Sequence, residues 1–67
     1  MRLSDRYAEL SPEQRKALAE RVGTDHRYLW QLATGWRDRR PSIDLIRKLC
    51  EADAALSVSD LVEEFTK

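Results

Sequence analysis

One short segment, from His26 to Thr34, carries side chains of the types that read the edges of DNA bases. Arg27 can donate two hydrogen bonds to O6 and N7 of guanine, and Gln31 can form a pair of hydrogen bonds with adenine. His26 can donate or accept near the floor of a groove, and Trp30 can contact a thymine methyl group or a sugar. Two other interpretations are open: a solvated surface helix for all of them, and packing for Trp30. The choice depends on the elements that position the segment.

Enzymatic chemistry has little support in the residue inventory. The chain has a single histidine and a single cysteine, so these residues cannot supply a four-ligand metal site. It shows no glycine-rich phosphate loop and no nucleophile beside a base. Cys50 is predicted to be a small, buried apolar residue. We therefore expect no enzymatic activity, no cofactor and no small-molecule ligand.

Capping signals and helical periodicity predict an all-α fold, a compact bundle of about five short helices without strands. The chain of 67 residues is expected to be one domain. Ser11-Pro12-Glu13-Gln14 has the form of a capping box with proline at the first helical position. Asp25, Ser42 and Ser57 are further cap residues. The predicted helices cover about residues 4–9, 12–22, 26–34 and 43–52, with a last helix after Ser57.

A tight turn is predicted between the second and third helices. Gly23 can adopt the positive φ that ends the second helix, and Asp25 can cap the third. Ala19 supplies a small side chain where the two helices cross. Leucines of the third helix are expected to pack back against the second, which leaves the side with Arg27 and Gln31 outward. This arrangement is a helix-turn-helix, the motif that places its second helix in the major groove. The inward residues are predicted to be Ala17, Leu18, Val22, Leu29, Leu32 and Ala33, with Ile43, Ile46, Leu49 and Cys50 on the fourth helix.

The charge of the chain is polarised although its formal sum is zero. Residues 13–48 contain nine Lys or Arg and five Asp or Glu, a net charge of +4. Residues 49–67 contain one Lys and five Asp or Glu, a net charge of −4. Such a distribution matters more for binding DNA than the total does.

The two helices and their turn resemble a known family. The residues that carry the resemblance are Lys16-Ala17-Leu18-Ala19-Glu20-Arg21-Val22-Gly23 and Tyr28-Leu29-Trp30-Gln31-Leu32-Ala33-Thr34-Gly35. They resemble the helix-turn-helix of the phage Cro and CI repressors, the lambda-repressor-like family. The similarity is greatest to small Cro-like regulators, a group that includes the YdaS-type antitoxins.

The resemblance implies which residues contact the DNA backbone. In the family, the start of the first helix of the pair and the loop after the second contact phosphates. These places correspond to Arg15, Thr34, Arg37, Arg39 and Arg40 here. Trp36 is expected to stack on the fourth helix and hold this loop.

A homodimer is predicted on a palindromic operator, because one helix reads too few base pairs to find a single site in a genome. The C-terminal part, about residues 53–67, is expected to contribute the contact. It holds an apolar set, namely Leu56, Val58, Leu61, Val62 and Phe65. The alternative is that these five residues only close the core of the monomer.

The sequence thus predicts a sequence-specific regulator of transcription, of the kind found as a phage Cro-like switch, an antitoxin-like autorepressor or a regulator of an anti-CRISPR operon. Its expected partner is an operator in double-stranded DNA. Two alternatives stay open: a protein-interaction module that uses Leu61, Val62 and Phe65, and a non-specific architectural DNA binder. No stretch is apolar and long enough for a membrane and no signal-peptide pattern begins the chain, so the expected compartment is the cytoplasm.

Overall fold

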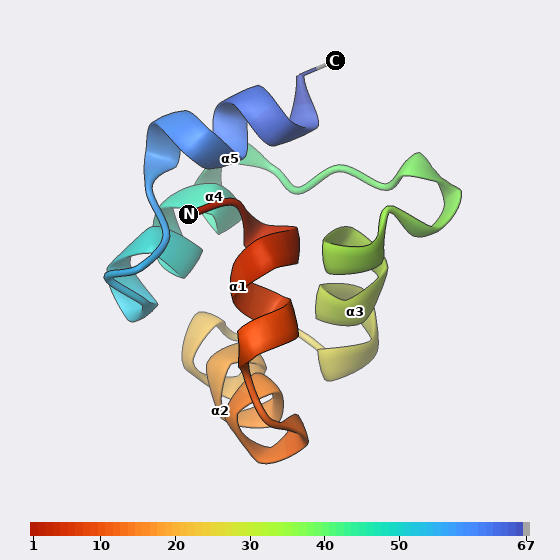
Figure 1. Cartoon of the computed structure of the whole chain (residues 1–67), viewed down its shortest axis with the longest axis vertical. Coiled ribbons are helices and arrows are strands. Elements are labelled where there is room, and N and C mark those ends of the chain that lie inside the picture. The colour runs from red at the N-terminus through yellow and green to blue at the C-terminus, as the bar shows by residue number, and fades with distance from the viewer. Residues whose placement is uncertain (67) are drawn as a thin grey trace.

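The structure, a computed structural model, describes residues 1–66. Most of these residues lie in helices. Within this range there are five α-helices, one 3-10 turn and no strand. The elements are α1 (Leu3–Glu9), α2 (Pro12–Val22), α3 (His26–Thr34), η1 (Trp36–Asp38), α4 (Ile43–Ala52) and α5 (Val58–Phe65) (Figure 1). The predicted all-α bundle is confirmed, and the loop after α3 contains the additional turn η1.

The helices begin where the sequence places their caps. Ser11 and Gln14 form the predicted capping box, with Gln14 N–H donating to Ser11 Oγ at 3.2 Å and Ser11 N–H donating to Gln14 Oε1 at 2.8 Å. Asp25, Ser42 and Ser57 accept from the backbone of α3, α4 and α5 in the same way. These side chains satisfy N–H groups that a helix leaves without partners in its first turn.

The core is built mainly from leucines of all five helices, and Leu29 of α3 lies at full burial within it. Its members are Leu3, Leu10, Leu18, Ala19, Val22, Leu29, Leu32, Ala33, Ile46, Leu49, Leu56 and Leu61. The expectations for Ala17 and Ile43 were wrong, since both are exposed. Ile43 is 75% exposed, because side chains tilt toward the N-terminus of their helix and the first residue of α4 points beyond its end. Cys50 is half-buried.

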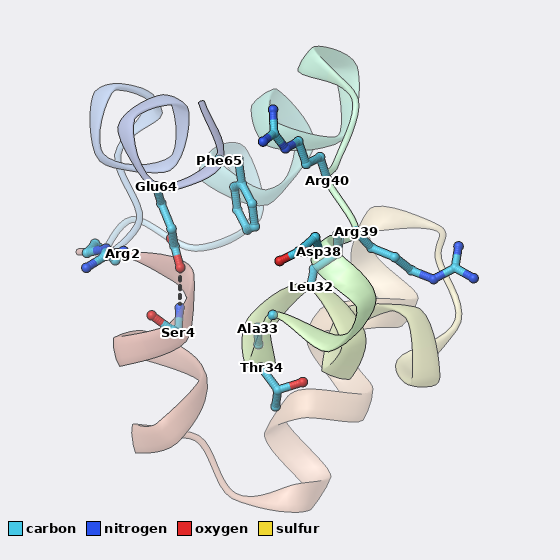
Figure 2. Close-up of a pocket in the computed structure, with 11 residues that line it drawn as sticks. Arg2, Ser4, Leu32, Ala33, Thr34, Asp38, Arg39, Arg40, Glu64 and Phe65 are labelled. Carbon is cyan, nitrogen blue, oxygen red and sulfur yellow. Dashed lines mark hydrogen bonds between the residues drawn. The ribbon is translucent and has the colours of Figure 1, made fainter. Parts of the chain in front are cut away.

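The first helix is held by residues far away in sequence. The side chain of Arg2 does not cap α1; instead Glu64 of α5 accepts hydrogen bonds from the N–H groups of Leu3 at 2.7 Å and Ser4 at 3.2 Å. Figure 2 shows Glu64 reaching across to Ser4. Arg6 Nε donates to Asp53 Oδ2 at 2.8 Å, which ties α1 to the segment after α4. These contacts fix α1 between α5 and α3.

Among the described residues, none of the helices has both the length and the apolar character needed to cross a membrane.

Candidate nucleic-acid interface

A short, well-defined turn sets the position of α3 relative to α2. Gly23 ends α2 with φ 75° and ψ 29°, a left-handed conformation that glycine adopts without a steric penalty. Its N–H bonds back to α2, and Thr24 N–H donates to the carbonyl of Ala19 at 2.9 Å. Asp25 Oδ1 then accepts from Arg27 N–H at 2.9 Å and begins α3. Ala19 is 1% exposed, as expected for a small residue where two helices meet.

The third helix has one buried side and one exposed side. Leu29, Leu32 and Ala33 are buried against the core. The five residues predicted to lie outward are His26, Arg27, Trp30, Gln31 and Thr34; Gln31 is half-buried and the other four are exposed. The structure therefore gathers every predicted base-reading side chain on one helical surface, which we call the α3 face.

Two of the outward residues of α3, Thr34 and His26, have local partners that restrict their side chains. Thr34 Oγ1 donates to the carbonyl of Trp30 at 2.8 Å, so its proton is used within the helix and its oxygen remains an acceptor. Phosphates also accept, so the predicted backbone role of Thr34 has weak support in this geometry. His26 Nδ1 lies 3.5 Å from Asp25 Oδ1, which keeps the imidazole at the start of α3.

Tyr7 of α1 belongs to this surface, although the sequence analysis did not name it among the candidate site residues. It lines two hollows, of about 340 and 290 Å³. The larger hollow lies at the start of α2, where the other lining residues are Pro12, Glu13, Arg15, Lys16 and His26. The smaller hollow lies at the α3 face, where the other lining residues are His26, Arg27, Trp30 and Gln31. A tyrosine at the edge of an apolar stripe could have signalled this position, because its ring packs inward while its hydroxyl reaches solvent.

The predicted phosphate-binding arginines lie around aromatic rings. The Arg15 guanidinium lies 4.1 Å from the centre of the Tyr7 ring. Arg37 and Arg39 lie 4.4 and 5.6 Å from the centre of the Trp36 ring. The expectation placed Trp36 on the fourth helix, whereas the structure places its ring 6.5 Å from that of Trp30 on α3. This ring contact joins residues 36–40, which we call the basic turn, to the α3 face.

A further hollow, of about 370 Å³, lies behind the C-terminal end of α3, between the basic turn and α5. Figure 2 shows Asp38 directed into it and Arg39 directed away from it. Arg40 is exposed, and its carbonyl accepts a hydrogen bond from the Tyr28 hydroxyl at 3.4 Å. The turn therefore separates its charges, with the carboxylate toward α5 and the guanidinium of Arg39 toward Trp36.

The residues proposed for a dimer contact fall into two groups. Leu56 and Leu61 are 4% and 0% exposed and are part of the core of the chain. Val58 and Val62 are 47% and 39% exposed, and Phe65 is half-buried against the core. Val58, Val62 and Phe65 follow one another at helical spacing, so they share one side of α5.

No protein-family model, curated protein or solved structure matches this chain.

Proposed function

We propose that this chain is a regulator of transcription that binds a specific sequence of duplex DNA and represses by occupying a promoter. The observation that carries the proposal is the two-sided α3, which packs on α1 and α2 and exposes Arg27, Trp30 and neighbouring polar side chains. An α-helix fits the major groove, and Arg and Gln are the side chains that pair bidentately with guanine and adenine there. The turn with the Gly23 and Asp25 caps holds α3 as a helix-turn-helix would.

The basic residues around α3 support the same function. Arg15, Arg37 and Arg39 flank the α3 face, and phosphate contacts from such side chains fix a protein on the duplex without reading sequence. The proposal also implies a location where DNA is accessible, which is the cytoplasm of a bacterial cell.

The test starts with selection of bound duplexes from a random pool, which yields the preferred site. Arg27→Ala and Gln31→Ala should each weaken binding to that site by about 1–3 kcal/mol and relax the preference at one base position. Arg21→Ala is the matched control, because Arg21 is an exposed arginine of α2 that lines a hollow with Arg6 and Asp53 and no residue of α3. If both α3 variants keep the affinity and the preference of the parent chain, α3 does not read the bases.

We propose that two copies act together on a palindromic operator, because the information read by a single helix is too small for one genomic site. The side of α5 that bears Val58, Val62 and Phe65 is the contact this proposal uses, since Leu56 and Leu61 are already buried. Half-site centres about 34 Å apart are expected for two helices in successive major grooves. Mutation of each half-site in turn tests this: a lone half-site that binds one chain as tightly as the full operator contradicts the dimer.

A second candidate is a protein-interaction module, favoured by the exposed apolar side chains Ile43, Val58 and Val62. A gel shift with the promoter of the chain's own gene and a scrambled competitor separates the candidates. A shift of the promoter duplex but not of the scrambled duplex supports the transcriptional regulator. Salt-sensitive binding of both duplexes indicates an architectural DNA binder, and binding of neither favours the interaction module.

A further inference from the structure

Arginines stacked on aromatic rings flank both ends of α3. Beside its N-terminal half, Arg15 lies over the Tyr7 ring at 4.1 Å, and Arg15 Nε also donates to the Tyr7 carbonyl at 3.0 Å. Beyond its C-terminal end, Arg37 lies over the Trp36 ring at 4.4 Å with Arg39 near the same ring. Guanidinium groups stack well on aromatic faces, so these rings restrict where the charges can point.

These arginines keep hydrogen-bond donors available. The ion pairs within residues 1–66 involve the N-terminal amine, Arg6, His26 and Lys48, and do not include Arg15, Arg37 or Arg39. A ring face leaves the edge of the guanidinium plane open, and two N–H groups on that edge match two oxygens of a phosphate. The stacking therefore orients the groups and leaves their donors to a ligand.

The two clusters lie at different places along α3, which is short enough to fit in a DNA groove. The residues of α3, from His26 to Thr34, rise by roughly 1.5 Å each, so the helix is roughly 12 Å long from first to last residue. The major groove is about 12 Å wide, with a row of phosphates along each border. One cluster lies beside the N-terminal half of α3 and the other beyond its C-terminal end, so both lie next to the phosphate rows of the groove when α3 lies in it.

The backbone of the turn supports a functional purpose for its side chains. Arg37 has φ 55° and Asp38 has φ 52°, both in the left-handed region, which glycine enters freely and other residues enter at an energetic cost. A residue held in such a conformation on the surface, where glycine would be more stable, points to a use for its side chain. For Arg37 the exposed guanidinium is the feature that glycine would lack.

We propose that Tyr7 with Arg15, and Trp36 with Arg37 and Arg39, are two phosphate clamps for the DNA backbone that stacking assembles before DNA binds. This inference rests on the proposed function and adds to it the role of the two rings, which hold the arginines in place. Tyr7 and Trp36 are positioning residues, because they act by restricting the arginines. A restricted side chain loses less freedom on binding, which strengthens the phosphate contact without adding a charge.

The test uses a random-sequence duplex of fixed length, because phosphate contacts do not depend on sequence. Tyr7→Leu and Trp36→Leu should each weaken binding by about 3–10-fold, the effect of ordering one long side chain. The slope of log affinity against log salt should stay unchanged in these variants, because no charge is lost. Arg15→Ala and Arg37→Ala should instead lower the slope by about one each. Arg21→Ala is the matched control for loss of a charge away from α3.

A second pair of variants tests the clamps without changing either aromatic ring, so the test does not depend on the leucine variants being folded. Arg15→Lys and Arg37→Lys keep the charge but lose the planar group that stacks. They should weaken binding as the leucine variants do, again at constant slope, and thermal unfolding should confirm that they remain folded. Tyr7→Phe keeps the ring and should retain most of the affinity.

Binding equal to that of the parent chain in the folded leucine and lysine variants overturns the clamps. So does a failure of the chain to bind the random-sequence duplex at low salt. If instead the clamps behave as expected but selection yields no preferred sequence, the clamps stand and the proposed sequence specificity fails.

Discussion

Asp53 is expected to be the single most important carboxylate for the stability of this fold. Its Oδ2 accepts from Arg6 Nε at 2.8 Å and its Oδ1 accepts from Ala55 N–H at 3.0 Å. The side chains of Arg6 and Asp53 are 28% and 12% exposed, so water competes only partly for the pair. Asp53→Ala removes both bonds and releases α1 from the segment between α4 and α5.

The expected size of the effect follows from these bonds. A hydrogen bond with a charged partner contributes about 1.5–3 kcal/mol when well shielded, and residual solvent reduces it, so we expect a loss of about 2 kcal/mol in Asp53→Ala. Asp53→Asn keeps an oxygen for Ala55 N–H and should lose about 1 kcal/mol. A domain of this size has a total stability of roughly 3–10 kcal/mol, so both losses are measurable.

The assay is thermal and urea unfolding followed by helical circular dichroism. Each kcal/mol should lower the melting temperature by about 4–8 °C in a small domain. Asp44→Ala is the matched control, because Asp44 pairs with Lys48 at 3.5 Å on an exposed surface and should contribute at most about 0.5 kcal/mol. If Asp53→Ala and Asp44→Ala unfold at the same temperature, the assignment of Asp53 as a structural anchor is refuted.

Four further outcomes are expected from the same measurements. Burial alone would raise the pKa of Asp53, but the hydrogen bonds from Arg6 and from the backbone outweigh it and lower that pKa. The stability that Asp53 contributes should therefore be complete above a pH of about 4 and lost as the pH falls through its lowered pKa, so the difference between the parent chain and Asp53→Asn should shrink in acid. Gly35→Ala should lower the free energy of unfolding by about 1 kcal/mol, because Gly35 has φ 73° and alanine is strained in that conformation. A clearly smaller loss would contradict this backbone strain. Leu29→Ala, at a fully buried position, should cost about 2–5 kcal/mol and abolish cooperative unfolding if the total stability is at the low end. Ile43→Ser should change stability by less than about 0.5 kcal/mol, because the side chain is 75% exposed; a large loss would show that Ile43 is part of the core.

The helices could be predicted from the sequence because their limits are set locally. Ser11, Asp25, Ser42 and Ser57 cap from within three residues of the bonds they form, and Gly23 ends α2 through its own backbone. Helical periodicity also separated the buried side of α3 from its exposed side correctly. A pattern of neighbours along the chain is sufficient for features of this kind.

The remaining features depend on contacts between distant parts of the chain. The bond from Leu3 to Glu64 joins residues 61 positions apart, and that from Arg6 to Asp53 joins residues 47 positions apart. No local pattern indicates either pairing. Tyr7 was missed at the candidate interface for the same reason, since its position beside α3 follows from how α1 packs. The base-reading and phosphate-binding roles stay predictions, because they concern a ligand and not the fold.

The separation of charge along the chain acquires a structural meaning from these distant contacts. Two carboxylates from the C-terminal part of the chain are bound to α1. Asp53 accepts from the Arg6 side chain, and Glu64 accepts from the first N–H groups of the helix. Their charge is therefore engaged by α1, and it does not pair with the arginines stacked around α3. A field near a surface depends on the charges close to it, so a chain of zero formal charge can still present a cationic surface there. The contacts of Asp53 and Glu64 with α1 thus have two consequences: they cap and anchor that helix, and they keep these two carboxylates from pairing with Arg15, Arg37 or Arg39.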